Sequence, residues 1–370
     1  MASTQAPTQQ SASVSATLTA APATILLLLL GRVLYLLYFH PLHAYPGPLL
    51  WKITNIPLSY HTFKGSIATQ YPLLHRKYGS VVRTAPNELS YTDPQAWKDV
   101  HGARKPEFPK DLARSAMPPN GSYSISMAPY EDHARFRRLL AHAFSEQGLR
   151  EQQPIIQKYV DLLIARLAEA TKSGSSTDLL EWYILVTFDI IGDLAWGESF
   201  NGLRECRIHE WIPAIYGNLQ YVVQAGILGK MVCLHLESES ASVTDSSQGL
   251  GYLSRYLVKK ETAINRRRNF VFSGELARKR AESDGGPRGD FWDRVLIKSV
   301  DENVSGEGMT KGEMVNNASF LALAGGDTVK TALTGITYLL FTHPEAREKL
   351  AKEVRSTFTS TDEIGMSLFL

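Results

Sequence analysis

The longest run of apolar positions lies near the N-terminus. Residues 1–31 contain no Lys, Arg, Asp or Glu, and most positions from 20 to 39 are apolar. Twenty such residues match one helical crossing of a bilayer. Arg32 lies inside the run and would cost roughly 2–3 kcal/mol at mid-membrane, less where its long side chain reaches a headgroup. The pattern predicts a transmembrane anchor over 20–39, with residues 1–19 on the lumenal side.

A cleaved signal peptide is the rival interpretation of this run. No basic region precedes the apolar stretch, and no small-x-small cleavage site follows it. Positive charges occur only toward its C-terminal side, at Arg32, Lys52 and Lys64. Because positively charged flanks stay in the cytosol, we expect a single-pass anchor with the body of the protein facing the cytosol.

Behind the anchor, the polar and apolar positions predict a stiff hinge and a small β region. Residues 40–48 contain three prolines, which cannot continue a helix and favour an extended spacer. Residues 80–85 and 89–91 are separated by a Pro-Asn-Glu turn, which predicts a short hairpin. Asp93 and the proline after it are typical of a helix start.

Farther along, apolar positions recur at helical spacing. They form one stripe within 136–144 and another within 155–167. Residues 179–196 are apolar on most sides, which is typical of a central helix. Residues 229–250 are polar without periodicity and predict a solvated loop. The pattern predicts one mainly helical domain over 49–370.

The last long helical pattern begins at a capping box. In Thr310-Lys-Gly-Glu313 the threonine hydroxyl accepts from a first-turn amide, and the glutamate accepts from the amide of the cap residue. Apolar positions then continue to Pro344, which ends the helix. A helix over about 311–342 would be roughly 48 Å long. Such a rod is long enough to cross a whole domain.

The middle of this helix carries Ala-Gly-Gly-Asp-Thr at 324–328. Two glycines inside a helix cost roughly 1 kcal/mol each relative to alanine, so something should compensate. Gly325 and Gly326 would let another helix pack closely, with Asp327 and Thr328 as incidental polar residues. Alternatively, they would make room for a flat ligand beside a carboxylate and a hydroxyl suited to proton delivery. The pattern alone leaves both interpretations open.

Composition narrows the functional classes. The 370 residues carry a formal charge of +2, which gives no broad electrostatic footprint for nucleic acid. The two cysteines, Cys206 and Cys233, have no zinc-site spacing and suggest no disulfide framework, which fits a body in the reducing cytosol. Asn-x-Ser sequons at Asn120, Asn303 and Asn317 would stay unmodified there.

Several of these blocks together resemble the cytochrome P450 family. Residues 320–328 (FLALAGGDT), followed by 342–354 (THPEAREKLAKEV), resemble the oxygen-binding I helix and the J helix, whose pattern is Ala/Gly-Gly-x-Asp/Glu-Thr. Five further blocks resemble fungal secondary-metabolism members, including trichothecene-type hydroxylases. They are 45–48 (YPGP), 75–83 (HRKYGSVVR), 86–90 (PNELS), 133–138 (HARFRR) and 188–194 (FDIIGDL).

The resemblance implies a mainly α fold of the cytochrome P450 type with a small β region, preceded by one transmembrane helix in the endoplasmic reticulum membrane. It implies a heme cofactor and the oxidation of a lipophilic small molecule by dioxygen. The electrons would come from NADPH through NADPH-cytochrome reductase.

Within the I-helix motif, the resemblance implies that Ala324 and Gly325 adjoin the heme. It also implies that Thr328 hydrogen-bonds bound dioxygen and that Asp327 relays protons toward it. Val329 stands where the family often has a second threonine, which removes one hydroxyl but spares Thr328.

The block at 133–138 has a helical geometry that points to two residues. At 100° per residue from Phe136, His133 falls near about 60° and Arg137 near about 100°, so both should border the core, whereas Arg138 falls near about 200°. His133 and Arg137 match the family's Trp-x-x-x-Arg pair, which binds a heme propionate, with histidine in place of tryptophan. A guanidinium pairs bidentately with a carboxylate, which favours Arg137.

Two family patterns do not occur in the 370 residues. These are the Glu-x-x-Arg of the K helix and the loop Phe-x-x-Gly-x-Arg-x-Cys-x-Gly that supplies the heme-ligand cysteine. Residues 362–370 resemble the linker before the K helix, and 229–250 depart from the family where substrate-access helices are expected. We therefore expect an incomplete fold, without an axial cysteine, that is inactive as written. The alternative to an enzyme is a non-catalytic remnant or a membrane-bound fragment.

Overall fold

The computed structural model describes residues 9–102, 108–110, 118, 120–172, 174, 176–232, 260–283, 288–298, 308–360 and 363–365. The chain divides into two compact units, which are described separately. The N-terminal unit comprises Met1–Phe108 and Ile227–Glu239, and the helical unit comprises Pro109–Gly226 and Ser240–Leu370. Helices dominate the described residues, whose only sheet has two strands, as the mainly helical prediction required.

The N-terminal unit begins with the predicted apolar helix. Helix α1 (Gln9–Leu34) continues into a π-helical turn, η1 (Tyr35–Phe39). Pro22–Phe39 is long and apolar enough to cross a membrane, and it is the single such helix in the described part of the chain. The side chains of residues 25–30 are each more than half exposed. Exposing a row of leucine side chains to water is unfavourable, and a helix of this kind is stable when these side chains are buried in lipid.

The rest of this unit contains α2 (Leu49–Ile53), α3 (Ile56–Phe63), α4 (Ile67–Tyr78), β1 (Val81–Ala85), β2 (Glu88–Tyr91) and α5 (Pro94–His101). The strands form the predicted antiparallel hairpin. Asp93 caps α5 by accepting from the backbone N–H of Gln95 at 2.8 Å. Arg83 is fully buried on β1 and donates to the backbone oxygens of Pro86 and Leu36. Its guanidinium thereby joins the hairpin to η1.

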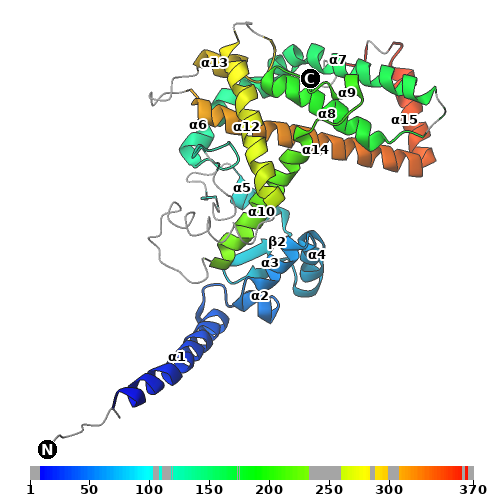
Figure 1. The fold of residues 1–370 in the computed structure, drawn as a ribbon. Helices are drawn as coiled ribbons and strands as arrows, with labels where there is room; N and C mark the ends of the chain where they lie inside the picture. Colours follow the sequence, from blue (N-terminus) through cyan, green and yellow to red (C-terminus); the bar gives the residue numbers. More distant parts are fainter. Residues whose placement is uncertain are drawn as a thin grey trace, which may run out of the picture. The chain divides into compact units, whose positions relative to one another are not determined.

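The helical unit contains α6 (Tyr130–Leu140), a 3₁₀ turn η3 (Ala141–Phe144), α7 (Glu146–Thr171), α8 (Leu179–Trp196), α9 (Gly202–Glu205), α10 (Trp211–Val232, whose last turns fall in the N-terminal unit), α12 (Lys260–Glu282), α13 (Asp293–Lys298), α14 (Lys311–Thr342) and α15 (Pro344–Thr357). Helix α8 is the predicted central helix, and most of its residues are buried. It packs along α14 and against α7 (Figure 1).

Two carboxylates on α8 organise the chain around it. Asp189 is 1% exposed and accepts from the backbone N–H groups of Gly202 and Leu203, which holds the start of α9. Asp193 accepts from the Tyr159 hydroxyl at 2.7 Å and pairs with Arg288 at 2.9 Å. Burial is the main cause that raises the pKa of Tyr159, and the hydrogen bond to Asp193 adds to it. Partnered carboxylates explain how an apolar helix can carry buried acids.

Helix α14 has the predicted bounds and the predicted capping box, with both hydrogen bonds between Thr310 and Glu313 present. Its first half is packed in the core, as Ala318 and Ala322 are fully buried. Its second half is less covered by the described residues: Ile336, Tyr338, Leu339 and Phe341 are each more than half exposed.

Three details differ from the periodicity prediction. Phe144 and Val160 belong to the two predicted apolar stripes but are 55% and 38% exposed, because each lies at the margin of its stripe. The predicted loop at 229–250 begins too early, because α10 stays helical to Val232. The remainder of that loop, including Cys233, lies outside the described residues, as does Asn303.

Candidate functional site

The two glycines of α14 face α8. A Cβ on Gly325 would lie 2.7 Å from Cδ1 of Ile191, and one on Gly326 would lie 2.9 Å from Cζ of Phe188. Both distances are far below van der Waals contact, so glycine is what allows the helices to approach this closely. The close-packing interpretation therefore holds for this face of α14. Any flat ligand must approach the helix from another side.

Thr328 lies on such a side. It is exposed, and its hydroxyl donates to the backbone oxygen of Ala324 at 2.5 Å. Ala324 and Thr328 are four residues apart and so share one face of the helix. This hydrogen bond to the preceding turn fixes the orientation of the hydroxyl and leaves it exposed. Its oxygen can therefore still accept a hydrogen bond from a ligand.

Asp327 is held by two partners that the sequence did not single out. Its Oδ1 accepts from Nζ of Lys330 at 2.6 Å and from the hydroxyl of Tyr216 at 2.8 Å. Burial favours the neutral carboxyl, but the hydrogen bonds from Lys330 and Tyr216 outweigh it, so the pKa of Asp327 lies below its ordinary value. The acid is therefore ionised at neutral pH.

The three groups form one hydrogen-bonded cluster, because Nζ of Lys330 also lies 3.2 Å from the Tyr216 hydroxyl. Burial and then the bond to Asp327 raise the pKa of Tyr216. Burial alone would lower the pKa of Lys330, yet its hydrogen bonds to Asp327 and Tyr216 raise it. Lys330 follows Asp327 by three residues, a spacing that predicts a helical ion pair. Tyr216 belongs to α10, and no local pattern indicates its position.

Helix α6 presents a different arginine from the predicted one. Arg137 is exposed, and His133 is half-buried at the first turn. The prediction that Arg137 borders the core was therefore wrong. Arg135 is the interior guanidinium instead: it donates to Glu313 at 2.6 and 3.0 Å and to Asp132 at 2.7 Å. The position of Arg135 on the helix did not indicate this, because its partner Glu313 comes from the start of α14.

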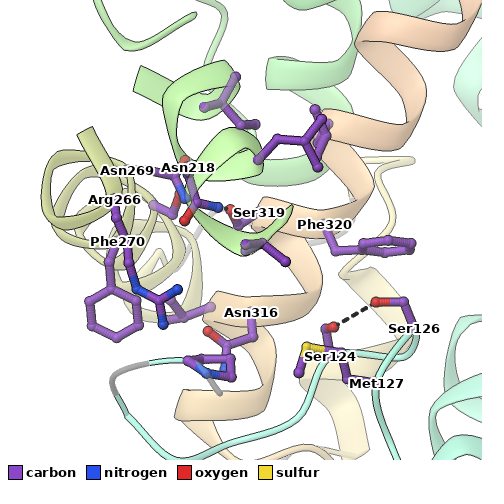
Figure 2. Close-up of a pocket in the computed structure, with 17 residues that line it drawn as sticks. Ser124, Ser126, Met127, Asn218, Arg266, Asn269, Phe270, Asn316, Ser319 and Phe320 are labelled. Carbon is purple, nitrogen blue, oxygen red and sulfur yellow. Dashed lines mark hydrogen bonds between the residues drawn. The ribbon is translucent and has the colours of Figure 1, made fainter. Parts of the chain in front are cut away.

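A pocket of about 230 Å³ lies beside the first half of α14. It is bounded by α10, α12, α14 and the segment before α6, and it reaches Leu323, one residue before Ala324 (Figure 2). Its lining is mixed, with Ile215, Leu219, Phe270, Val315 and Phe320 among the apolar residues and Asn218, Arg266, Asn269, Ser273 and Ser319 among the polar ones. The sequence patterns did not predict it, since its walls come from four separate segments.

The cysteine that the structure describes lies elsewhere. Cys206 is exposed at the end of α9, with a positive φ of 50°, and its thiol donates to the backbone oxygen of Leu203. Helix α9 packs against α7 and α8. Within the described ranges no group of three or more His, Cys, Asp or Glu side chains could hold a metal ion.

Comparisons with known proteins agree with the sequence blocks. The chain matches the cytochrome P450 family over residues 45–369. It is 40% identical over 339 residues to a versicolorin B desaturase of Emericella nidulans, covering 91% of this chain and 64% of that protein. It is 38% identical over 351 residues to a versicolorin B desaturase of Aspergillus parasiticus, covering 93% and 66%. It is 41% identical over 355 residues to an averantin hydroxylase of Dothistroma septosporum, covering 95% and 63%.

The chain thus spans less than two thirds of the length of each of these relatives. The match nevertheless includes the helix that bears Asp327 and Thr328, the α6 arginines and the hairpin. The capped 32-residue helix and the mainly helical fold agree with this match. The chain belongs to the cytochrome P450 family and resembles its monooxygenases of fungal secondary metabolism.

Proposed function

We propose that the protein containing this chain is a heme monooxygenase that oxidises a lipophilic small molecule, using dioxygen and electrons from NADPH delivered by a reductase. The observation that carries the proposal is the position of Asp327 and Thr328 one turn from a partly apolar pocket on the same helix. Relatives are named for desaturating versicolorin B and hydroxylating averantin, so we take a related fungal metabolite as the substrate.

The described residues fit a heme in part. The face of α14 with Ala324 and Thr328 is open, and the exposed Arg137 is free to turn toward a propionate. The face with Gly326 is filled by Phe188, so the glycines do not form the cradle that the motif suggests. No residue is assigned as the iron ligand, because Cys206 lies at the end of α9 and Cys233 is outside the described residues. The heme, when bound, supplies the oxidising iron centre.

The chain's own residues have clearer roles. Thr328 offers a hydroxyl on the open face of α14, where it can hydrogen-bond an oxygen of the reacting molecule. Asp327 is an ionised carboxylate one residue away. It can accept and return a proton once its hydrogen bond to Lys330 or to Tyr216 breaks. Lys330 and Tyr216 would thus regulate proton delivery, because the carboxylate is occupied while they are hydrogen-bonded to it.

The test compares two threonines of α14. Thr328→Ala removes the hydroxyl on the open face, whereas Thr331→Ala removes an exposed hydroxyl with the same bond to the preceding turn. In the full-length protein with reductase, and with versicolorin B and averantin as trial substrates, we expect Thr328→Ala to keep consuming NADPH while product falls and peroxide rises. Thr331→Ala should behave as wild type. Unchanged product per NADPH in Thr328→Ala would show that another group delivers the proton.

We further propose that the helix Pro22–Phe39 anchors the protein in the endoplasmic reticulum membrane with its body in the cytosol. The exposed apolar side chains of this helix and the basic residues after it support this arrangement. Carbonate extraction and protease protection of microsomes test it. Release into the supernatant, or a body shielded from protease, would contradict it.

A further inference from the structure

Two polar side chains of α12 line the pocket with unused hydrogen-bonding atoms. Ser273 is fully buried and Asn269 is 5% exposed. The amide nitrogen of Asn269 donates to Oγ of Ser319 at 3.3 Å. Among the described residues, neither Oδ1 of Asn269 nor Oγ of Ser273 has a hydrogen-bond partner. Buried polar atoms without partners are unfavourable and uncommon in folded proteins. Their presence on a pocket wall indicates a partner that enters the pocket.

The two residues act from one face of one helix. Asn269 and Ser273 are four residues apart, so their side chains are neighbours on α12. Ser319 of α14 lies beside Asn269, its hydrogen-bond partner (Figure 2). Exchanging the oxygen and nitrogen of the Asn269 amide would only move the unused atom from an acceptor to a donor. In either orientation one amide atom and the Ser273 hydroxyl remain for a ligand.

The surroundings narrow the class of ligand. Phe270 and Phe320 contribute aromatic rings to the wall. Arg266, one turn before Asn269, also lines the pocket, and its guanidinium lies 4.4 Å from the centre of the Tyr221 ring. A positive charge beside neutral donors and acceptors favours an acidic hydroxyl over an amine. The rings favour an aromatic body.

We propose that Asn269 and Ser273 form a subsite that recognises a phenolic hydroxyl of the ligand. The phenol donates to Oδ1 of Asn269 and accepts from the hydroxyl of Ser273, so both unused atoms are satisfied by one group. The inference rests on the proposed function in that the occupant is the substrate, and it names the substrate class as a hydroxylated aromatic.

Packing between α12 and α14 does not account for these residues. It explains the bond from Asn269 to Ser319, but an alanine at 273 would serve the same packing without an unused hydroxyl. A trapped water could satisfy the same atoms, and it would show no preference among ligands. Ligand selectivity therefore separates the proposal from both rivals.

The experiment measures binding, so it is independent of turnover. The probes are 2-naphthol and 2-methylnaphthalene, which differ by a hydroxyl against a methyl group, titrated into the full-length protein in detergent. We expect the wild type to prefer 2-naphthol. Ser273→Ala should weaken 2-naphthol binding about tenfold, the loss expected for one hydrogen bond, and leave 2-methylnaphthalene unchanged. Asn269→Leu, of similar volume, should act the same way.

The control is Ser356→Ala on the exposed helix α15, which should change neither affinity. Three results would overturn the subsite: no preference for 2-naphthol in the wild type, equal losses for both probes, or a lower unfolding temperature of Ser273→Ala. The last would reveal a structural partner for its hydroxyl. If the Thr328→Ala turnover test fails while this selectivity holds, only the proposed proton delivery is lost.

Discussion

Arg135 and Glu313 join the start of α14 to α6. Nη2 of Arg135 lies 2.6 Å from Oε1 of Glu313, and the same carboxylate accepts the backbone N–H of Thr310 at 2.9 Å. The hydrogen bond to Glu313 is the main cause of the raised pKa of Arg135. Both side chains are largely buried, at 18% and 13% exposed. One carboxylate therefore closes a capping box and neutralises an interior guanidinium.

Replacing this carboxylate should be strongly destabilising. Glu313→Ala leaves Arg135 without its main partner and removes half of the capping box, so we expect the free energy of unfolding to fall by about 3 kcal/mol. Glu313→Gln keeps the cap and should lose less. Denaturant unfolding followed by circular dichroism measures both, with Lys311→Ala, which changes an exposed residue of the same turn, as control. Equal losses in the alanine and glutamine variants would show that the capping hydrogen bond contributes nothing, whereas an unchanged glutamine variant would show that the charge is unimportant.

The glycine facing α8 should not tolerate a methyl group. In Gly326→Ala the new Cβ meets the ring of Phe188, which is fully buried and cannot move aside, so we expect a loss of about 1–3 kcal/mol. Gly335 lies on the same helix with no atom of the described residues within 4 Å of its Cβ position, and Gly335→Ala should gain about 1 kcal/mol from helix propensity. Thermal unfolding distinguishes the two. A stabilised Gly326→Ala would mean that α8 and α14 are not closely packed.

The ion pair of Asp327 predicts a specific acid response. Because its folded-state pKa is depressed, Asp327 contributes stability above its unfolded pKa of about 3.9, and that contribution is lost as pH falls through the lower folded pKa. Lys330→Met removes one of the two bonds that lower this pKa, so the folded-state pKa should rise toward the unfolded one and the acid-induced loss of stability should become smaller. The effect will be small, since Asp327 is 38% exposed and solvent screens the pair.

Unfolding curves at a series of pH values between about 3 and 7 measure this acid-induced loss of stability. Lys352→Met, which removes an exposed lysine of α15, serves as the matched control and should leave the pH profile unchanged. Identical profiles for Lys330→Met and wild type would show that Tyr216 alone sets the pKa of Asp327.

Residues 1–370 by themselves should not form a heme-thiolate centre. Such a centre would need a cysteine thiolate as an iron ligand, and the described cysteine, Cys206, is exposed at the end of α9 with its thiol hydrogen-bonded to the backbone oxygen of Leu203. Expression of residues 1–370 with heme supply, followed by the reduced carbon-monoxide spectrum, tests this expectation. A thiolate-type Soret band that survives Cys206→Ala but not Cys233→Ala would contradict it and identify Cys233 as the ligand.

Local rules determined most of the secondary structure. The Thr310–Glu313 box and the all-apolar stretch of α8 act over a few residues, as does the Pro-Asn-Glu turn of the hairpin, and each element formed where its pattern predicts. The apolar N-terminal helix could also be predicted from the sequence, because a run long enough to cross a bilayer needs no partner to define it. Family membership likewise followed from ordered blocks of sequence.

Only the tertiary structure decided which side chains meet. Whether Gly325 and Gly326 face a helix or a ligand depends on where α8 lies, and Asp327 owes its lowered pKa partly to Tyr216 on α10, 111 residues away. Arg135 rather than Arg137 is interior because Glu313 arrives from another helix. Pairing between distant segments arises from packing, which balances burial, shape and charge over the whole fold and leaves no periodic mark on either segment.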